Sequence, residues 1–199
     1  MRKLRFNRRP AVSTLAVAIV TLSSSCWILL GAGVAEAASK PVCHQADGYL
    51  IMARERGDAP GSDFIIRKTA ARTKPVECRF AFKKGDIRFP KQAGDDAYYY
   101  AGHYKDRLVL DSGTGSVRDI VAVDLKTGEI LAQQTSYQAP RLQGSRILYF
   151  ADGPVGTKEK CPGMDAGMLA SSKIEPEMAL DLDTLKTVAT GKVMCAYAE

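Results

Sequence analysis

Apolar and polar residues alternate over short stretches of this chain, and clusters of turn-forming residues separate many of those stretches. Alternation with a period of two is typical of half-buried β-strands, and no long segment keeps the 3.6-residue period of a helix. The pattern predicts a mainly β fold, an antiparallel β-sandwich or distorted barrel. We expect strands at Tyr49–Arg54, Phe64–Arg67, Glu77–Phe82, Ala97–Gly102, Arg107–Asp111, Ile120–Leu125, Ile130–Thr135, Arg146–Phe150, Met178–Leu182 and Lys192–Tyr197. The stretch Gly163–Ser172 fits one short helix or a loop.

A short internal repeat supports hairpins in this fold. Residues 121–128, Val-Ala-Val-Asp-Leu-Lys-Thr-Gly, resemble residues 178–185, Met-Ala-Leu-Asp-Leu-Asp-Thr-Leu. Each copy predicts a strand that runs into a tight turn, followed by a second strand. The pattern Asp-Leu-x-Thr-Gly is common in β-propeller blades, but a propeller needs several units at a regular period. Two copies therefore predict two hairpins of a sandwich or barrel.

The first 37 residues are typical of an export signal. A basic start precedes an uncharged, largely apolar run over residues 11–35, and Ala35-Glu36-Ala37 offers small residues where a signal peptidase cleaves. We expect cleavage near Ala37 and a single exported domain over residues 38–199, periplasmic or secreted. The apolar run is also long enough to span a bilayer, so a retained anchor is the alternative.

The cysteine count agrees with export. Cys26 leaves with the predicted signal peptide, and four cysteines remain, Cys43, Cys78, Cys161 and Cys195. An even number in an exported domain predicts two disulfides, for which three pairings exist. We favour Cys43–Cys78 and Cys161–Cys195, because each bond then closes a loop within one half of the chain. No paired Cys or His spacing indicates a metal site.

Charge narrows the range of partners. The chain has a formal net charge of +6, but the predicted signal peptide holds five of its 28 Lys and Arg residues and one of its 22 Asp and Glu residues. Cleavage would leave a net charge of +2. No block of Lys and Arg with interleaved aromatic residues remains, so nucleic acid is not an expected partner. Gly113-Thr114-Gly115 is too short for a phosphate loop, and we expect no cofactor. We also expect no stable membrane span after cleavage.

The sharpest local motif is Leu108–Gly115, with the sequence Leu-Val-Leu-Asp-Ser-Gly-Thr-Gly. It resembles the active-site turn of aspartic proteases, in which two carboxylates share one proton. One copy of the motif implies a homodimer that uses Asp111. In the non-catalytic interpretation, Asp111 and Ser112 end a strand, and the glycines permit a turn before Arg118. Ser112 lacks the Gly-x-Ser-x-Gly context of a hydrolase nucleophile.

A second resemblance spans most of the mature domain. The segment Leu110–Gly115, followed by Arg118 and Val123-Asp124-Leu125, resembles a family of small exported bacterial proteins of unassigned activity. The four cysteines fall at similar places. Ser116, Asp119 and Val123 stand where this family usually has Pro, Gly and Tyr. The resemblance implies a periplasmic β fold and no particular reaction.

The leading hypothesis is a non-enzymatic periplasmic binding module, inhibitor-like or immunity-like, whose partner is an envelope protein or a foreign protein. The glycine-rich loop is its expected binding element, with Asp111, Ser112, Gly113, Thr114, Gly115 and Arg118 as candidate binding residues. The alternative is the homodimeric aspartic protease with Asp111 as its catalytic residue.

Overall fold

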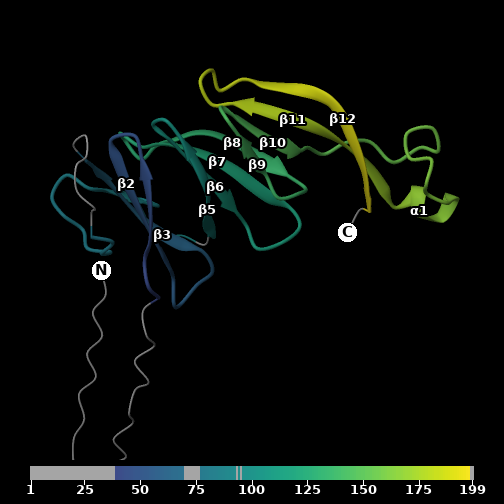
Figure 1. Cartoon of the computed structure of the whole chain (residues 1–199). Helices are drawn as coiled ribbons and strands as arrows, with labels where there is room; N and C mark the ends of the chain where they lie inside the picture. The colour runs from purple at the N-terminus through teal and green to yellow at the C-terminus, as the bar shows by residue number, and fades with distance from the viewer. Residues whose placement is uncertain (1–38, 70–76, 93, 95, 198–199) are drawn as a thin grey trace, which may run out of the picture. The chain divides into compact units, whose positions relative to one another are not determined.

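The computed structural model describes residues 39–69, 77–92, 94 and 96–197. The predicted signal peptide, with its cleavage site and Cys26, lies outside the described residues. Within the described ranges, twelve strands form three four-stranded antiparallel sheets, accompanied by one short helix (Figure 1). The predicted mainly β antiparallel fold is confirmed.

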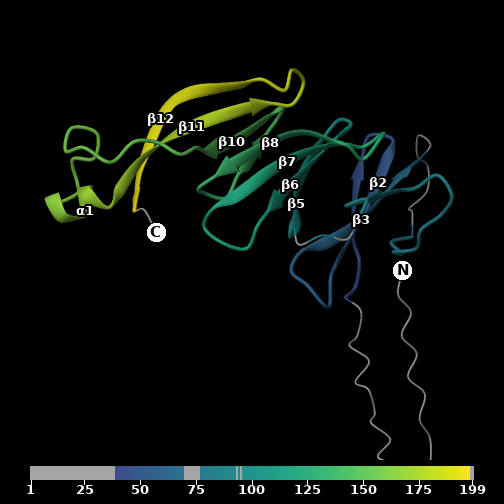
Figure 2. The same cartoon turned by 180° about the vertical axis from the view of Figure 1, so that it is seen from behind.

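Each sheet is a meander, in which strands adjacent in sequence are also neighbours in the sheet (Figure 2). Sheet A contains β1 (Val42–Ala46), β2 (Tyr49–Glu55), β3 (Ser62–Lys68) and β4 (Ile87–Phe89). Sheet B contains β5 (Tyr98–Tyr104), β6 (Arg107–Ser112), β7 (Arg118–Asp124) and β8 (Ile130–Ser136). Sheet C contains β9 (Arg141–Gln143), β10 (Arg146–Phe150), β11 (Ser172–Asp181) and β12 (Thr187–Tyr197).

Sheet B is covered on both faces. Successive residues of a strand point to opposite faces, and both sets are buried in the middle of β6 and β7. The cluster between sheets A and B includes Tyr49, Ile51, Phe64, Ile66, Phe89, Leu108, Leu110, Val121 and Val123. The cluster between sheets B and C includes Val109, Ile120, Ala122, Ile147, Tyr149, Leu180 and Leu182. The sandwich therefore has three layers, with sheet B in the middle.

The segment Glu77–Phe82 is not the strand that its alternation predicts. It lies against the outer face of sheet A, where Phe80 packs on a small cluster of buried side chains. The guanidinium of Arg54 lies over the Phe80 ring, 4.2 Å from its centroid, and Arg67 donates a hydrogen bond to the carbonyl of Ala81 at 2.7 Å. Side chains of sheet A hold the segment, so its alternation reflects packing over a face rather than pairing at an edge.

The two expected disulfides are confirmed, Cys43–Cys78 and Cys161–Cys195. The first ties β1 to the segment that covers sheet A. The second ties β12 to the connection that precedes the short helix α1 (Ala166–Ala170). This helix settles the choice left open for residues 163–172, and Asp165 caps it by accepting the backbone N–H of Met168.

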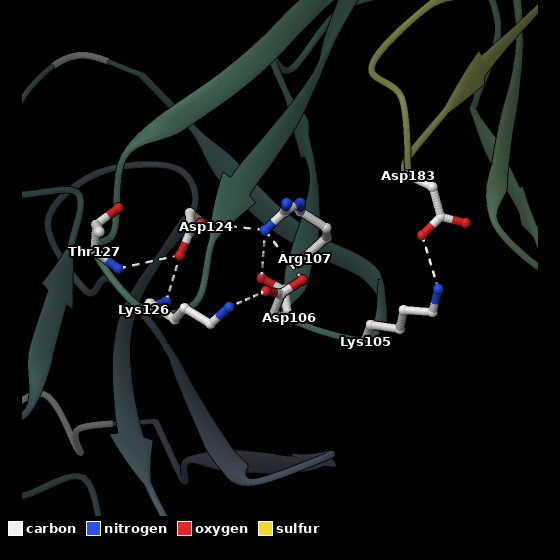
Figure 3. A network of polar contacts seen from close by, with 7 residues as sticks. All are labelled: Lys105, Asp106, Arg107, Asp124, Lys126, Thr127 and Asp183. Atoms are coloured by element: carbon white, nitrogen blue, oxygen red, sulfur yellow. Dashed lines mark hydrogen bonds and ion pairs between the residues drawn. The ribbon is translucent and has the colours of Figure 1, made fainter.

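The internal repeat forms two equivalent turns. In the β7–β8 turn, Asp124 Oδ1 accepts the backbone N–H groups of Lys126 and Thr127 at 2.6 and 3.2 Å (Figure 3). In the β11–β12 turn, Asp181 Oδ1 accepts those of Asp183 and Thr184 at 3.2 and 2.9 Å. The predicted hairpins at these positions are therefore confirmed.

Charged side chains link the turns at this end of sheet B. Arg107 pairs with Asp106 and with Asp124 across the strands, at 3.0 and 3.1 Å. Lys105, which precedes them in the β5–β6 turn, pairs with Asp183 of the β11–β12 turn at 2.8 Å (Figure 3). These contacts join sheet B to sheet C at the end of the sheet opposite the glycine-rich loop.

The equivalent turns differ at one position that needs a left-handed backbone. Gly128 has φ 69°, and Leu185 occupies the matching place with φ 57°. A side chain in this region costs roughly 1 kcal/mol. We therefore expect Leu185→Gly to raise the free energy of unfolding, by up to about 1 kcal/mol in urea titrations. The converse variant, Gly128→Leu, should destabilise the fold, because a Cβ there would lie 2.5 Å from Ile87. A loss of stability in Leu185→Gly, or a gain in Gly128→Leu, would contradict this prediction.

Candidate functional site

The glycine-rich loop is the turn between β6 and β7. Ser112 pairs with Asp119 across the two strands, so residues 113–117 form the connection. Gly113 has φ 121°, and its N–H donates to the carbonyl of Ala97 at 2.9 Å. Residues 114–117 are exposed. The sequence therefore presents four solvent-facing residues on a base that is anchored to the start of sheet B.

Arg118 fixes the shape of this loop. Its side chain forms an ion pair with Asp111, whose side chain is 13% exposed, and its Nε donates to the carbonyl of Gly115 at 3.0 Å. One guanidinium thus holds both the strand end and the tip of the loop. The second carboxylate oxygen of Asp111 is buried and accepts no hydrogen bond from the described part of the chain.

An open cavity of about 400 Å³ lies beside the loop. Its lining consists of Pro60, Asp96, Ala97, Ser112, Gly113, Thr114, Val117, Arg118, Asp119 and Thr135. Of the six candidate binding residues, Ser112, Gly113, Thr114 and Arg118 line the cavity. Asp111 and Gly115 do not, and they contribute through their contacts with Arg118.

The sequence does not indicate two acidic residues that line the cavity, Asp96 and Asp119. Asp119 accepts hydrogen bonds from Gln133 and Thr135 at 2.7 and 2.8 Å, which orient its carboxylate. Asp96 accepts from the hydroxyl of Tyr98 at 3.1 Å. If residues 113–117 form a short loop between two paired strands, Ser112 lies opposite Asp119. The sequence could have indicated Asp119 through this register. Asp96 carries no such signal, because it precedes its strand.

The two histidines do not serve this site. The ring of His44 stacks on Tyr100 with the centroids 3.5 Å apart, and His103 Nδ1 lies 2.6 Å from the Tyr100 hydroxyl. Burial lowers the pKa of His44, and the nearby His103 lowers it further. Among the contacts of the described residues, no hydrogen bond joins Ser112 to either histidine. The site therefore offers carboxylates, hydroxyls and one guanidinium, with the carboxylate of Asp119 beside the hydroxyl of Thr135.

The protease interpretation depends on a second copy of the chain. Two carboxylates must share a proton, whereas within one chain the carboxylate of Asp111 takes its hydrogen bond from Arg118. In a dimer, the two Asp111 side chains would have to meet even though each forms an ion pair with an Arg118. The interpretation stays a prediction.

Metal binding and similarity to known proteins add no further assignment. Within the part of the chain that the structure describes, no group of three or more His, Cys, Asp or Glu side chains is placed to hold a metal ion. In the same ranges, no helix has the length and apolar character that a membrane span needs. No protein-family model, curated protein or solved structure matches the chain. The resemblance to the family of small exported proteins therefore stays a prediction.

The contacts of Arg118 predict how the loop responds to substitution. Arg118→Met leaves the Asp111 carboxylate without its ion-pair partner in a largely buried place, so we expect a loss of about 1–3 kcal/mol in the free energy of unfolding. Adding Asp111→Asn removes the stranded charge and should recover part of that loss. Urea titration of the four variants of this double-mutant cycle measures the coupling. Strictly additive losses would show that the pair does not hold the loop.

Proposed function

We propose that this protein is a non-enzymatic binding module of the cell envelope, inhibitor-like or immunity-like, that docks a partner protein on its 112–118 loop. The observation that carries the proposal is a clamped, exposed loop beside a wide polar cavity. The exposed residues 114–117 stand on a base fixed by Arg118 and by the Gly113 hydrogen bond to Ala97. A preformed loop loses little conformational freedom on binding, which favours affinity.

The lining of the cavity favours a protein partner over a small molecule. Small-molecule sites are mostly apolar with a few polar groups, whereas six of the ten lining residues here are polar or charged. The carboxylates of Asp96 and Asp119 accept hydrogen bonds, and the hydroxyls of Ser112 and Thr114 both donate and accept them. Such a surface suits the backbone and polar side chains of a docked protein.

Export supports this proposal, and the disulfides support export. Two disulfides in one small domain are typical of oxidising compartments, such as the periplasm or the extracellular space. The predicted signal peptide over residues 1–37 points to the same compartment. Partners of the protein are accordingly envelope proteins or foreign proteins that reach the envelope.

A positive charge added to the loop tests the docking site. Thr114→Arg places a long cation on the tip of the loop, and we expect it to weaken capture of a stoichiometric partner from envelope extract at least about tenfold. Thr127→Arg is the matched control, because Thr127 is equally exposed but lies in the β7–β8 turn at the opposite end of sheet B (Figure 3). Quantitative pull-down followed by titration of the recovered partner measures the difference.

Two results of that comparison would oppose the proposal. Recovery of no stoichiometric partner by the wild type would remove its basis. Equal capture by the wild type and by both arginine variants would place the interface elsewhere on the protein.

Export has its own test. Protein recovered from the envelope should begin at residue 38 and should contain no free thiol among its four cysteines, because the signal peptide has been removed and both disulfides are formed. Intact mass spectrometry after alkylation without a reductant measures both features. A cytosolic species with an intact amino terminus, or four alkylated thiols, would contradict the proposed location.

A further inference from the structure

A second, smaller cavity lies on the other side of the same loop and contains a buried carboxylate. Glu175 of β11 lines this cavity of about 140 Å³, although the residue is only 3% exposed. The other lining residues are Ser116, Val117, Tyr137, Gln138, Lys173, Ala196 and Tyr197. Val117 also lines the 400 Å³ cavity, so the loop separates two adjoining cavities.

The Glu175 carboxylate is incompletely paired. The side chain of Gln138 lies beside it, and the buried Oε2 atom has no hydrogen-bond partner among the described residues. Burial raises the pKa of this carboxyl, and the nearby carboxylate of Asp152 raises it further. A buried acceptor without a donor lowers stability, because it loses its hydrogen bonds to water on folding and forms none within the protein. A docked donor would supply what Oε2 lacks.

The nearest cation is already engaged. The ammonium of Lys173 donates to Asp152 at 2.6 Å and lies over the Tyr137 ring, 5.3 Å from its centroid. Lys173 therefore forms its ion pair with Asp152, and its charge also acts on Glu175, whose pKa it lowers against the effect of burial. Two residues along the same strand, Glu177 is buried to the same degree but is fully paired, with Arg141 at 2.7 Å and with the hydroxyl of Thr190 at 2.8 Å. Of these two buried glutamates, Glu175 is the one with an unpaired carboxylate oxygen among the described residues.

The size and walls of the cavity restrict the ligand. A volume of about 140 Å³ is below the range of roughly 300–1,000 Å³ for drug-sized ligands and close to that of a cavity that holds benzene, about 150 Å³. It accepts one planar head group. Aromatic rings attract cations, and Tyr197 supplies a ring in addition to that of Tyr137, which Lys173 already faces. The free carboxylate oxygen requires a donor. A guanidinium is planar, cationic and rich in donors.

We propose that this cavity receives the guanidinium of an arginine side chain from the protein that docks on the 112–118 loop, with Glu175 as its counter-ion. The inference rests on the proposed function and names the chemistry that the partner must present. Since Val117 borders both cavities, a partner seated on the loop can insert one side chain beside Glu175 without leaving the loop.

The first experiment tests the cavity with small probes. Ethylguanidinium chloride is titrated into the ¹⁵N-labelled protein at constant ionic strength, with ethylurea as an uncharged probe of similar shape. We expect saturable shifts in the millimolar range at the amides of Val117, Gln138 and Ala196 for ethylguanidinium alone. Equal responses to the two probes, or no saturation, would overturn the proposal.

Two matched variants separate binding from folding. Glu175→Gln should weaken ethylguanidinium binding at least about tenfold, whereas Glu177→Gln should leave it unchanged. Their stabilities should move in opposite directions. The raised pKa means that ionised Glu175 opposes folding, so Glu175→Gln should raise the Tm at pH 7 by roughly 2–4 °C. That gain should vanish as the pH falls below the ordinary range of glutamate, where Glu175 is protonated in the folded and unfolded states. Glu177→Gln loses its paired charge and should lower the Tm.

The second experiment uses the partner captured by the wild type. Glu175→Gln should reduce that capture at least about tenfold, as Thr114→Arg does. If Thr114→Arg weakens capture but Glu175→Gln does not, the arginine proposal fails and the docking site on the loop survives. If ethylguanidinium binds but capture is insensitive to both variants, the cavity serves a free guanidinium compound, and the assignment to a partner side chain is overturned.

Discussion

The burial of sheet B on both faces is the constraint on which the rest of the structure depends. A slip of one residue between β6 and β7 would turn Leu108 and Leu110 from the cluster with sheet A to the cluster with sheet C, and Val109 the other way. Both clusters would lose their packing at once, so the register is fixed from two sides. The same register places Ser112 opposite Asp119 and leaves residues 113–117 for the loop. The geometry of the candidate site is therefore a consequence of the core.

Double burial also explains what the sequence could and could not predict. The apolar runs Leu108–Leu110 and Ile120–Val123 lack alternation because both faces of their strands are covered. The turns of the internal repeat were predictable, since the paired Asp side chains accept backbone N–H groups within four residues. The three-residue strands β4 and β9 are too short to show a period, and their pairing depends on contacts distant in sequence.

The candidate site follows the same division. The sequence identifies Ser112, Gly113, Thr114 and Arg118, because a strand end, a glycine turn and a cation are local features. It does not identify Asp96, which reaches the cavity only because sheet A and sheet B come together there. The sequence does not identify Glu175 either, for a different reason. Its position on β11 indicates a half-buried strand, and only the packing of the 116–117 segment and of Gln138 around it creates the cavity.

The two ends of sheet B differ in how completely their carboxylates are paired. At the end shown in Figure 3, every carboxylate of Asp106, Asp124 and Asp183 has a cationic partner, and the turns are joined by these pairs. At the loop end, the buried carboxylates of Asp111 and Glu175 each keep one oxygen without a donor among the residues that the structure describes. Stability alone would favour pairing at both ends, since each unmet acceptor costs free energy. The proposed partner gives a physical reason for this difference, because its donors would pair with the carboxylate oxygens that the described residues leave unpaired.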